Sequence, residues 1–287
     1  NLFVKNQKIF LLLKALKRFL RIKLKIGIIG YGAVGKACSE GFISLGHSII
    51  LHDTKLKTKI DDLFEANIIF ICVPTPVDED GSCDTSVVES CVEDLKSISY
   101  NGIICIKSTV EPGTTINLSK KYDLDLCFVP EFLRERCALE DFLNNHDLLA
   151  VGTENLDSQK IIIEAHGNLP KNIKLLTPTE AELLKYFCNS YNALKVIFAN
   201  NFFEIASHFE ADYKNVLDSF LQRNIKNDDY LSVNENLRGY GGVCLPKDVK
   251  ALVALTKKLN ISLKLFQAID RDNKMLETTV FEGMRKK

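Results

Sequence analysis

Short apolar runs alternate with helical patterns through the first half of the chain. The apolar runs predict buried strands at Leu24–Ile29, Ser48–His52, Asn67–Val73, Gly102–Lys107, Leu124–Val129 and Leu148–Val151. Helical spacing predicts helices at Lys36–Leu45 and Ser86–Ile98, a further helix opening at Pro112-Gly113, and only a short helix within Lys55–Ala66. Continuous apolar strands that alternate with helices are typical of α/β proteins with a Rossmann-like, doubly wound parallel sheet.

The pattern changes at Thr177, where a long helical stretch begins that continues to Phe209. Thr177 or Thr179 can cap its start. The sequence also predicts that this helix carries one apolar stripe, made of Tyr186, Phe187, Leu194, Ile197 and Phe198. Shorter helices are predicted near Asn215–Gln222, Lys247–Leu259 and Phe266–Met284. We therefore expect a sheet domain at 24–176 and a mainly α-helical second domain at 177–287, with the long helix connecting the domains and forming a homodimer.

The composition is that of an ordinary globular protein. Lysine plus arginine and aspartate plus glutamate number 37 each, so the net charge gives no reason to expect a nucleic-acid partner. The nine cysteines are an odd number, and Cys72 and Cys105 lie inside apolar runs. This usage argues against a disulfide framework and favours a reducing, cytoplasmic location. The histidines form no cluster, no cysteine or histidine spacing is typical of a metal site, and we expect no metal.

Residues 1–23 form a basic amphipathic extension that is too short and too charged to span a bilayer. Such a segment can lie on a membrane surface or against a partner. A terminal helix packed on the domain, or a poorly ordered extension, is the favoured alternative.

A glycine fingerprint follows the first predicted strand and opens the first predicted helix. It comprises Gly30, Tyr31, Gly32, Ala33, Val34 and Gly35. In such a turn the first glycine makes the tight bend, the second lets a diphosphate approach the backbone, and the third packs helix against strand. The next strand ends at Asp53, where a carboxylate can bind a ribose diol and repel a 2′-phosphate. The sequence therefore predicts an NAD site rather than an NADP site.

Polar and proline residues mark the ends of the later strands. Val73, Pro74, Thr75 and Pro76 must turn out of the sheet at its carboxyl edge, where ligands bind in such folds. Thr109 stands at another strand end, where its hydroxyl can meet a cofactor or a water molecule.

The stretch Gly239–Asp248 carries the strongest candidate for covalent chemistry. Its glycines let backbone amides approach a ligand, and Pro246 can open a helix directly after Cys244. A thiol at a helix start near Lys247 is favoured as a thiolate nucleophile, and Asp248 can take or orient a proton. The alternative is a glycine-rich turn with a buried cysteine. On the long helix, Lys185 and Asn189 share a face because they lie four residues apart.

Together these motifs resemble the UDP-glucose/GDP-mannose 6-dehydrogenase family. The matching segments, in order, are Gly30–Gly35, Val73–Pro76, Lys107–Val110 with Pro112-Gly113, Pro130–Glu135, Ala181–Lys185 with Asn189, and Gly239–Asp248. The last segment is most similar to the short bacterial UDP-glucose enzymes of that family. The resemblance implies four-electron oxidation of a sugar 6-hydroxyl to a carboxylate with two molecules of NAD.

The resemblance also assigns roles to residues. Cys244 would form a thiohemiacetal and then a thioester, Lys185 and Asn189 would stabilise oxyanions, Glu135 and Thr109 would activate water, and Asp248 would assist proton transfer. The implied cofactor contacts are Gly30, Tyr31, Gly32, Ala33, Val34, Gly35, Asp53, Val73, Pro74, Thr75, Thr109, Glu131 and Lys247. The implied substrate contacts are Glu131, Phe132, Leu133, Arg134, Lys185, Asn189, Tyr240, Gly241 and Gly242.

Two departures from the family leave other functions open. Members usually carry a third domain, which would begin where this chain ends at Lys287, and we expect it to be missing. The family's arginine that reaches a partner subunit has no clear match in Asp228–Leu237, and Arg223 is a weak candidate. The alternatives are a non-catalytic protein that binds NAD or a sugar nucleotide, and a two-electron dehydrogenase of the β-hydroxyacid type, which has no use for Cys244.

Overall fold

The computed structural model describes residues 23–222, 238–242, 244–258 and 264–276. The expectations for residues 1–22, Arg223 and 228–237 lie outside this range. The chain divides into two compact units. Unit 1 holds the chain up to Pro74 with Val88–Ser108 and Thr115–Ala181, and unit 2 holds Thr75–Val87, Thr109–Thr114 and the chain from Glu182. Two stretches that the sequence places in the first domain therefore pack in unit 2, because the chain leaves the sheet after Pro74 and after Ser108.

The described residues of unit 1 form a seven-stranded sheet in the order β2-β1-β3-β4-β5-β6-β7. The strands are β1 Lys25–Ile29, β2 Ser48–His52, β3 Ile68–Ile71, β4 Ile103–Ile106, β5 Leu126–Phe128, β6 Leu148–Gly152 and β7 Asn172–Leu176. The pairs from β2 to β5 are parallel, as the sequence predicts. The β5–β6 pair is antiparallel, joined at Phe128 and Gly152, and β6 and β7 are again parallel.

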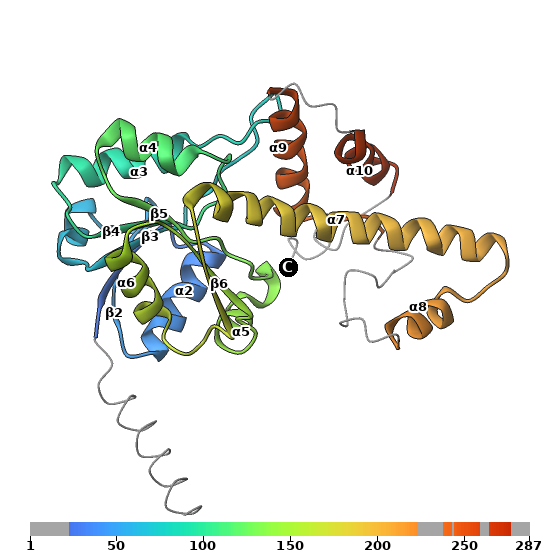
Figure 1. The fold of residues 1–287 in the computed structure, drawn as a ribbon, viewed down its shortest axis with the longest axis horizontal. Helices are drawn as coiled ribbons and strands as arrows, with labels where there is room; N and C mark the ends of the chain where they lie inside the picture. The colour runs from blue at the N-terminus through green and yellow to red at the C-terminus, as the bar shows by residue number, and fades with distance from the viewer. Residues whose placement is uncertain (1–22, 223–237, 243, 259–263, 277–287) are drawn as a thin grey trace, which may run out of the picture. The chain divides into compact units, whose positions relative to one another are not determined.

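Helices cover both faces of this sheet. They are α2 Ala33–Ser44, α3 Ser86–Ser97, α4 Thr114–Tyr122, α5 Ala138–Leu143 and α6 Leu156–His166, with the 3-10 turns η1 Ile60–Glu65 and η2 Glu135–Cys137. Figure 1 shows α3 and α4 together on one face and α2, α5 and α6 on the other. The predicted doubly wound architecture is thus confirmed. The sequence did not predict α5, α6 or β7.

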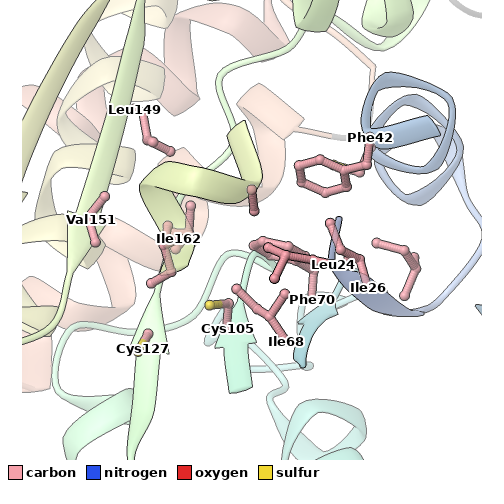
Figure 2. Close-up of a cluster of buried hydrophobic side chains, with 14 of the residues drawn as sticks. Leu24, Ile26, Phe42, Ile68, Phe70, Cys105, Cys127, Leu149, Val151 and Ile162 are labelled. Carbon is pink, nitrogen blue, oxygen red and sulfur yellow. The ribbon is translucent and has the colours of Figure 1, made fainter. Parts of the chain in front are cut away.

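The core of unit 1 lies where α2, α5 and α6 pack on the sheet (Figure 2). Phe42 of α2 stacks on Phe70 of β3 with ring centroids 5.1 Å apart. Helix α5 approaches α2 closely because residue 41 is glycine: a Cβ there would lie 2.1 Å from the Phe142 ring. Burial on both faces explains why the strands read as continuous apolar runs.

The remaining described helices are α7 Pro178–His208, α8 Tyr213–Leu221, α9 Cys244–Lys258 and α10 Lys264–Lys274. The predicted long helix is confirmed as α7. A small core in unit 2 joins Ala193 and Ile197 of α7, Val249 of α9 and Ile269 of α10. Helix α9 begins at Cys244, earlier than predicted, because a proline such as Pro246 is tolerated in the first turn of a helix.

The predicted single stripe on α7 is wrong in one respect. Tyr186 and Ile197 are buried, whereas Phe187 and Phe198 are 70% and 51% exposed. The apolar residues therefore occupy two faces of the helix, and only one of them contributes to the core. Among the described helices, none is both long and apolar enough to cross a membrane.

Candidate functional site

The glycine turn after β1 has the geometry of a dinucleotide site. Gly30 has a φ of +91°, and a Cβ there would lie 2.6 Å from the Cys72 carbonyl oxygen. A Cβ on Gly35 would lie 2.0 Å from the Gly30 carbonyl oxygen, so this position admits only glycine. A Cβ on Gly32 would meet nothing within 4 Å, which leaves open space beside the backbone. Each glycine thus does what the fingerprint predicts.

The start of α2 and the end of β2 complete this end of unit 1. Gly32 is the N-cap of α2 and supplies no side-chain cap, so the first amides of the helix face outward to a ligand. Asp53 accepts hydrogen bonds from the Tyr31 amide at 2.6 Å and the Lys55 amide at 2.8 Å. These bonds lower the pKa of Asp53, which is held as a carboxylate beside the glycine turn. The residues present therefore fit NAD.

A buried ion pair lies at the carboxyl ends of β4 and β5. The Lys107 Nζ is 3.0 Å from Oε2 of Glu131, and their side chains are only 1% and 9% exposed. Burial raises the pKa of Glu131, but the Lys107 ammonium outweighs that effect, and the net pKa of Glu131 is lowered. Burial lowers the pKa of Lys107, but the Glu131 carboxylate outweighs that effect and the net pKa of Lys107 is raised, so both groups stay charged. Glu131 is thus bound within unit 1.

Lys107 was not predicted as a site residue, although the sequence carried a signal for it. A lysine ends an apolar strand, and a glutamate follows the end of the next strand along the sheet. Because neighbouring parallel strands end at the same edge, such residues are placed to meet.

The segment that follows Glu131 is held by a second carboxylate. Arg134 donates to Asp141 of α5 through Nε at 2.9 Å, through Nη2 at 2.8 Å and through its backbone amide at 2.9 Å. Burial raises the pKa of Asp141, but the bonds from Arg134 outweigh it and bring the pKa to about 2. Phe132 and Leu133 are half-buried between these two anchors, and Glu135 is exposed at the start of η2.

Five of the predicted site residues lie close together in unit 2, and they come from four separate segments of the chain. The carboxylate of Asp248 accepts a hydrogen bond from the Asn189 amide and lies 3.2 Å from Nζ of Lys247. That ammonium reaches the Thr75 hydroxyl at 3.3 Å, and the hydroxyl donates to the Thr109 carbonyl oxygen at 2.8 Å. Asp248 is 1% exposed. A carboxyl group so placed can hold or move a proton near an amide donor.

Lys185 and Cys244 lie one helical turn from members of this cluster. Lys185 precedes Asn189 by one turn on α7 and is buried, although most helix lysines are solvated. Cys244 is the exposed first residue of α9, one turn before Asp248. A second thiol, Cys83, was not predicted. Its Sγ lies 3.4 Å from the Thr109 carbonyl oxygen, and burial raises its pKa.

The turn before α9 is fixed by α10. The Tyr240 amide donates to Oδ1 of Asn273 at 2.7 Å, and the Tyr240 carbonyl accepts from Nδ2 of Asn273 at 3.0 Å. The Tyr240 ring is buried in the small core of unit 2. Gly239 and Gly242 both have positive φ, of 78° and 75°. Tyr240 thus shapes the turn, and a ligand contact through its amide would require breaking the bond to Asn273.

Comparison with known proteins places these features in one family. Residues 52–169 match the NAD-binding domain of the UDP-glucose/GDP-mannose dehydrogenase family, and residues 179–275 match its central domain. The chain is 33% identical over 295 residues to the UDP-glucose 6-dehydrogenase of Rickettsia bellii, covering 88% of this chain and 67% of that protein. It is 28% identical over 310 residues to the GDP-mannose 6-dehydrogenase of Pseudomonas putida, covering 90% and 70%.

A solved structure has the same fold. The UDP-glucose dehydrogenase of Pyrobaculum islandicum matches with a TM-score of 0.82 at 24% identity, over 89% of this chain and 69% of that chain. The chain thus spans about two thirds of the length of these relatives.

Proposed function

Because this chain belongs to the UDP-glucose/GDP-mannose dehydrogenase family, we propose that it oxidises UDP-glucose to UDP-glucuronate through a covalent thioester on Cys244. Family membership makes it an NAD-dependent nucleotide-sugar dehydrogenase, and the sugar and the thioester are the parts proposed here. The observation that carries the proposal is the contact of Asp248 with Asn189 and Lys247, one turn from Cys244 on α9.

The chain's own residues hold the cofactor. The amides at the start of α2 bind the diphosphate in the open space beside Gly32, and Asp53 binds the ribose diol. NAD, when bound, accepts a hydride from the sugar C6 carbon in each of the two oxidations.

In the first oxidation the 6-hydroxyl becomes an aldehyde. The hydroxyl proton passes to the Asp248 carboxylate, directly or through a water, while the C–H bond breaks. Lys185 and Asn189 stabilise the negative charge that develops on the oxygen, since both are buried and carry N–H donors, one of which Asn189 uses for Asp248.

The second oxidation proceeds on the thiol. The Cys244 thiolate attacks the aldehyde carbon, and the new oxyanion forms a thiohemiacetal that is stabilised by the same two donors. Loss of the C6 hydrogen as hydride converts it to a thioester. A water then attacks the thioester carbon, with Glu135 and Thr109 orienting it and Glu135 accepting its proton. The C–S bond breaks with the thiolate as leaving group, and the carboxylic acid so formed loses its proton to solvent to give the carboxylate product.

The test is the stoichiometry of NADH release. We expect the purified chain to form two NADH per UDP-glucose, and less product from GDP-mannose or UDP-N-acetyl sugars. Cys244→Ser should form at most one NADH per sugar, because no thiohemiacetal can form. Full activity of Cys244→Ser would favour the two-electron β-hydroxyacid reaction. NAD binding without turnover of any of these sugars would favour a non-catalytic binding protein.

We also propose a homodimer in a reducing, cytoplasmic environment. An exposed apolar face of α7 carries Leu183, Phe187, Tyr191 and Phe198, and the Phe187 and Tyr191 rings stack with centroids 6.5 Å apart. Contiguous exposed apolar residues of this kind are typical of protein interfaces. Cys105 and Cys127 face each other on neighbouring strands as buried thiols, as is usual where thiols are kept reduced.

A further inference from the structure

The stretch Glu131–Arg134 of unit 1 is anchored at both ends by charged contacts. Glu131 is held by Lys107 at the end of β4, and Arg134 is held by Asp141 of α5. The second oxygen of Glu131 also accepts the Phe132 amide at 2.9 Å, which bends the backbone back onto the carboxylate. Both charged side chains of the stretch are therefore used inside unit 1.

A purely structural role accounts poorly for the Lys107–Glu131 pair. Desolvating two charges costs about as much free energy as their attraction returns, and apolar residues of similar volume fill such a place equally well. An ion pair adds one defined arrangement of the two side chains, because a buried ammonium must lie beside the carboxylate oxygens that neutralise it. The Lys107 Nζ also lies 5.6 Å from the Phe70 ring centroid, and the Cys38 thiol donates to the same Glu131 oxygen at 3.9 Å.

The second anchor has the same character. Asp141 is buried, and it accepts from Nε, Nη2 and the backbone amide of Arg134 as well as from Asn145 at 3.3 Å. A forked arginine contact fixes direction as well as distance. The main chain at Arg134 is held by the same carboxylate that holds its side chain, so the backbone between the two anchors has little freedom.

We propose that Lys107 and Asp141 are positioning residues that clamp the Glu131–Arg134 backbone in the shape that receives the sugar nucleotide. This rests on the proposed function, in which the stretch contacts the substrate. A backbone fixed before binding loses little conformational entropy when the ligand arrives, and here the two carboxylates hold the amides of Phe132 and Arg134 in place. Glu131 then acts as a permanent anion that orders the stretch, rather than as a base that titrates during the reaction.

The test compares Lys107→Met and Asp141→Asn with Lys121→Met, in the full chain. Lys121 pairs with Glu89 in the same unit but is exposed, so it is a matched control for the loss of a lysine. We expect hydrogen exchange of peptides covering residues 130–137 to accelerate about 10-fold in the two clamp variants, without any ligand, and to stay unchanged in the control.

The kinetic readout separates positioning from stability. We expect the clamp variants to raise the KM for UDP-glucose about 10-fold or more, with the KM for NAD little changed. If Lys107→Met fails to fold, the double variant Lys107→Met/Glu131→Gln removes both charges, and it should fold while keeping the high KM. If hydrogen exchange of residues 130–137 is unchanged in Lys107→Met and Asp141→Asn, these residues do not hold the backbone. If exchange is faster but the KM for UDP-glucose is normal, they hold the backbone without positioning the substrate. If the parent chain oxidises no nucleotide sugar, the proposed function and the proposed ligand of the stretch are wrong. The exchange data still decide whether Lys107 and Asp141 hold the backbone.

Discussion

The buried carboxylate of Asp248 is the residue on which the proposed chemistry of unit 2 most depends. A buried charge costs free energy unless it is paired and hydrogen-bonded, and here an amide from Asn189 and the Lys247 ammonium supply the partners. The same partners hold the carboxylate in one orientation, one turn from Cys244 on α9. This combination suits a group that accepts a proton in a fixed direction.

Replacing Asp248 by Asn tests that role, because it exchanges one carboxylate oxygen for an amide nitrogen. The change keeps the shape and removes the charge, so we expect kcat to fall about 10²-fold while the fold persists. Steady-state kinetics with far-UV circular dichroism as the folding check measures both. Asp218→Asn is the control, because Asp218 forms an exposed ion pair with Lys214 in the same unit. A variant with the kcat of the parent would remove Asp248 from the mechanism.

We expect the Asp53 side chain to set the choice between NAD and NADP. We expect Asp53→Ala to weaken NAD binding about 10-fold. The ratio of the affinity for NAD to the affinity for NADP should fall, since the variant no longer repels a 2′-phosphate. Calorimetry with each dinucleotide gives the two affinities. Asp62→Ala, in the exposed turn η1, is the matched control. Equal preference for NAD in parent and variant would show that selectivity lies elsewhere.

Sequence patterns could predict the residues whose chemistry is written in local motifs. Gly30, Gly35 and Asp53 belong to one fingerprint, and the structure gives each the predicted geometry. Lys107 carried a weaker signal, because a lysine and a glutamate at the ends of two strands meet only if those strands are neighbours, and Asp141 carried none, because its importance comes from Arg134 outside its own helix. Spacing along the chain does not state which cation meets which carboxylate across a sheet edge.

At the level of elements, hydrophobic periodicity was sufficient to predict a helix or strand whose own sequence shows a clear pattern of apolar residues. Strand β2 was predicted at its observed bounds, and α7 within two residues at its start. Strand β7 was missed because it is an exposed strand at the edge of the sheet, paired with β6, and its three apolar residues form only a short run. Helix α6 did carry a signal, since Asn155 caps it by accepting from the amides of Asp157 and Ser158.

The two-faced character of α7 leads to a prediction about assembly. Its exposed aromatic residues include Phe187, and an interface built on them should not tolerate a buried, unpaired charge. We expect Phe187→Glu to convert a dimer to a monomer, with the dissociation constant raised at least about 100-fold. Sedimentation analysis over a concentration series measures this. Phe64→Glu, an exposed phenylalanine in unit 1, is the control, and a variant that stays dimeric would rule out this face.

At the scale of the whole molecule, stability depends on neutral histidines inside unit 1. His166 is fully buried, with its ring against Phe42 and Phe70 at centroid distances of 5.1 and 5.7 Å. His146 lies beside it at 5.7 Å. Burial lowers the pKa of His166 well below 6.5, and the positive charge of Lys107 lowers it further. An acid-sensitive group thus stands at the centre of the core that supports the cofactor site.

This arrangement predicts how the unfolding free energy changes with pH. The unfolded chain protonates His166 near pH 6.5 whereas the folded chain does not, so protons favour unfolding as the pH falls. Stability is fully present above pH 6.5, and we expect a loss of about 1 kcal/mol per pH unit below it from this residue alone. Urea unfolding followed by circular dichroism between pH 7 and pH 5 measures the slope. His166→Phe should flatten it, because a phenyl ring fills the same aromatic pocket and takes up no proton. The partly exposed His52 provides the control variant His52→Phe, which should leave the slope unchanged, and parallel slopes for all three proteins would contradict the assignment to His166.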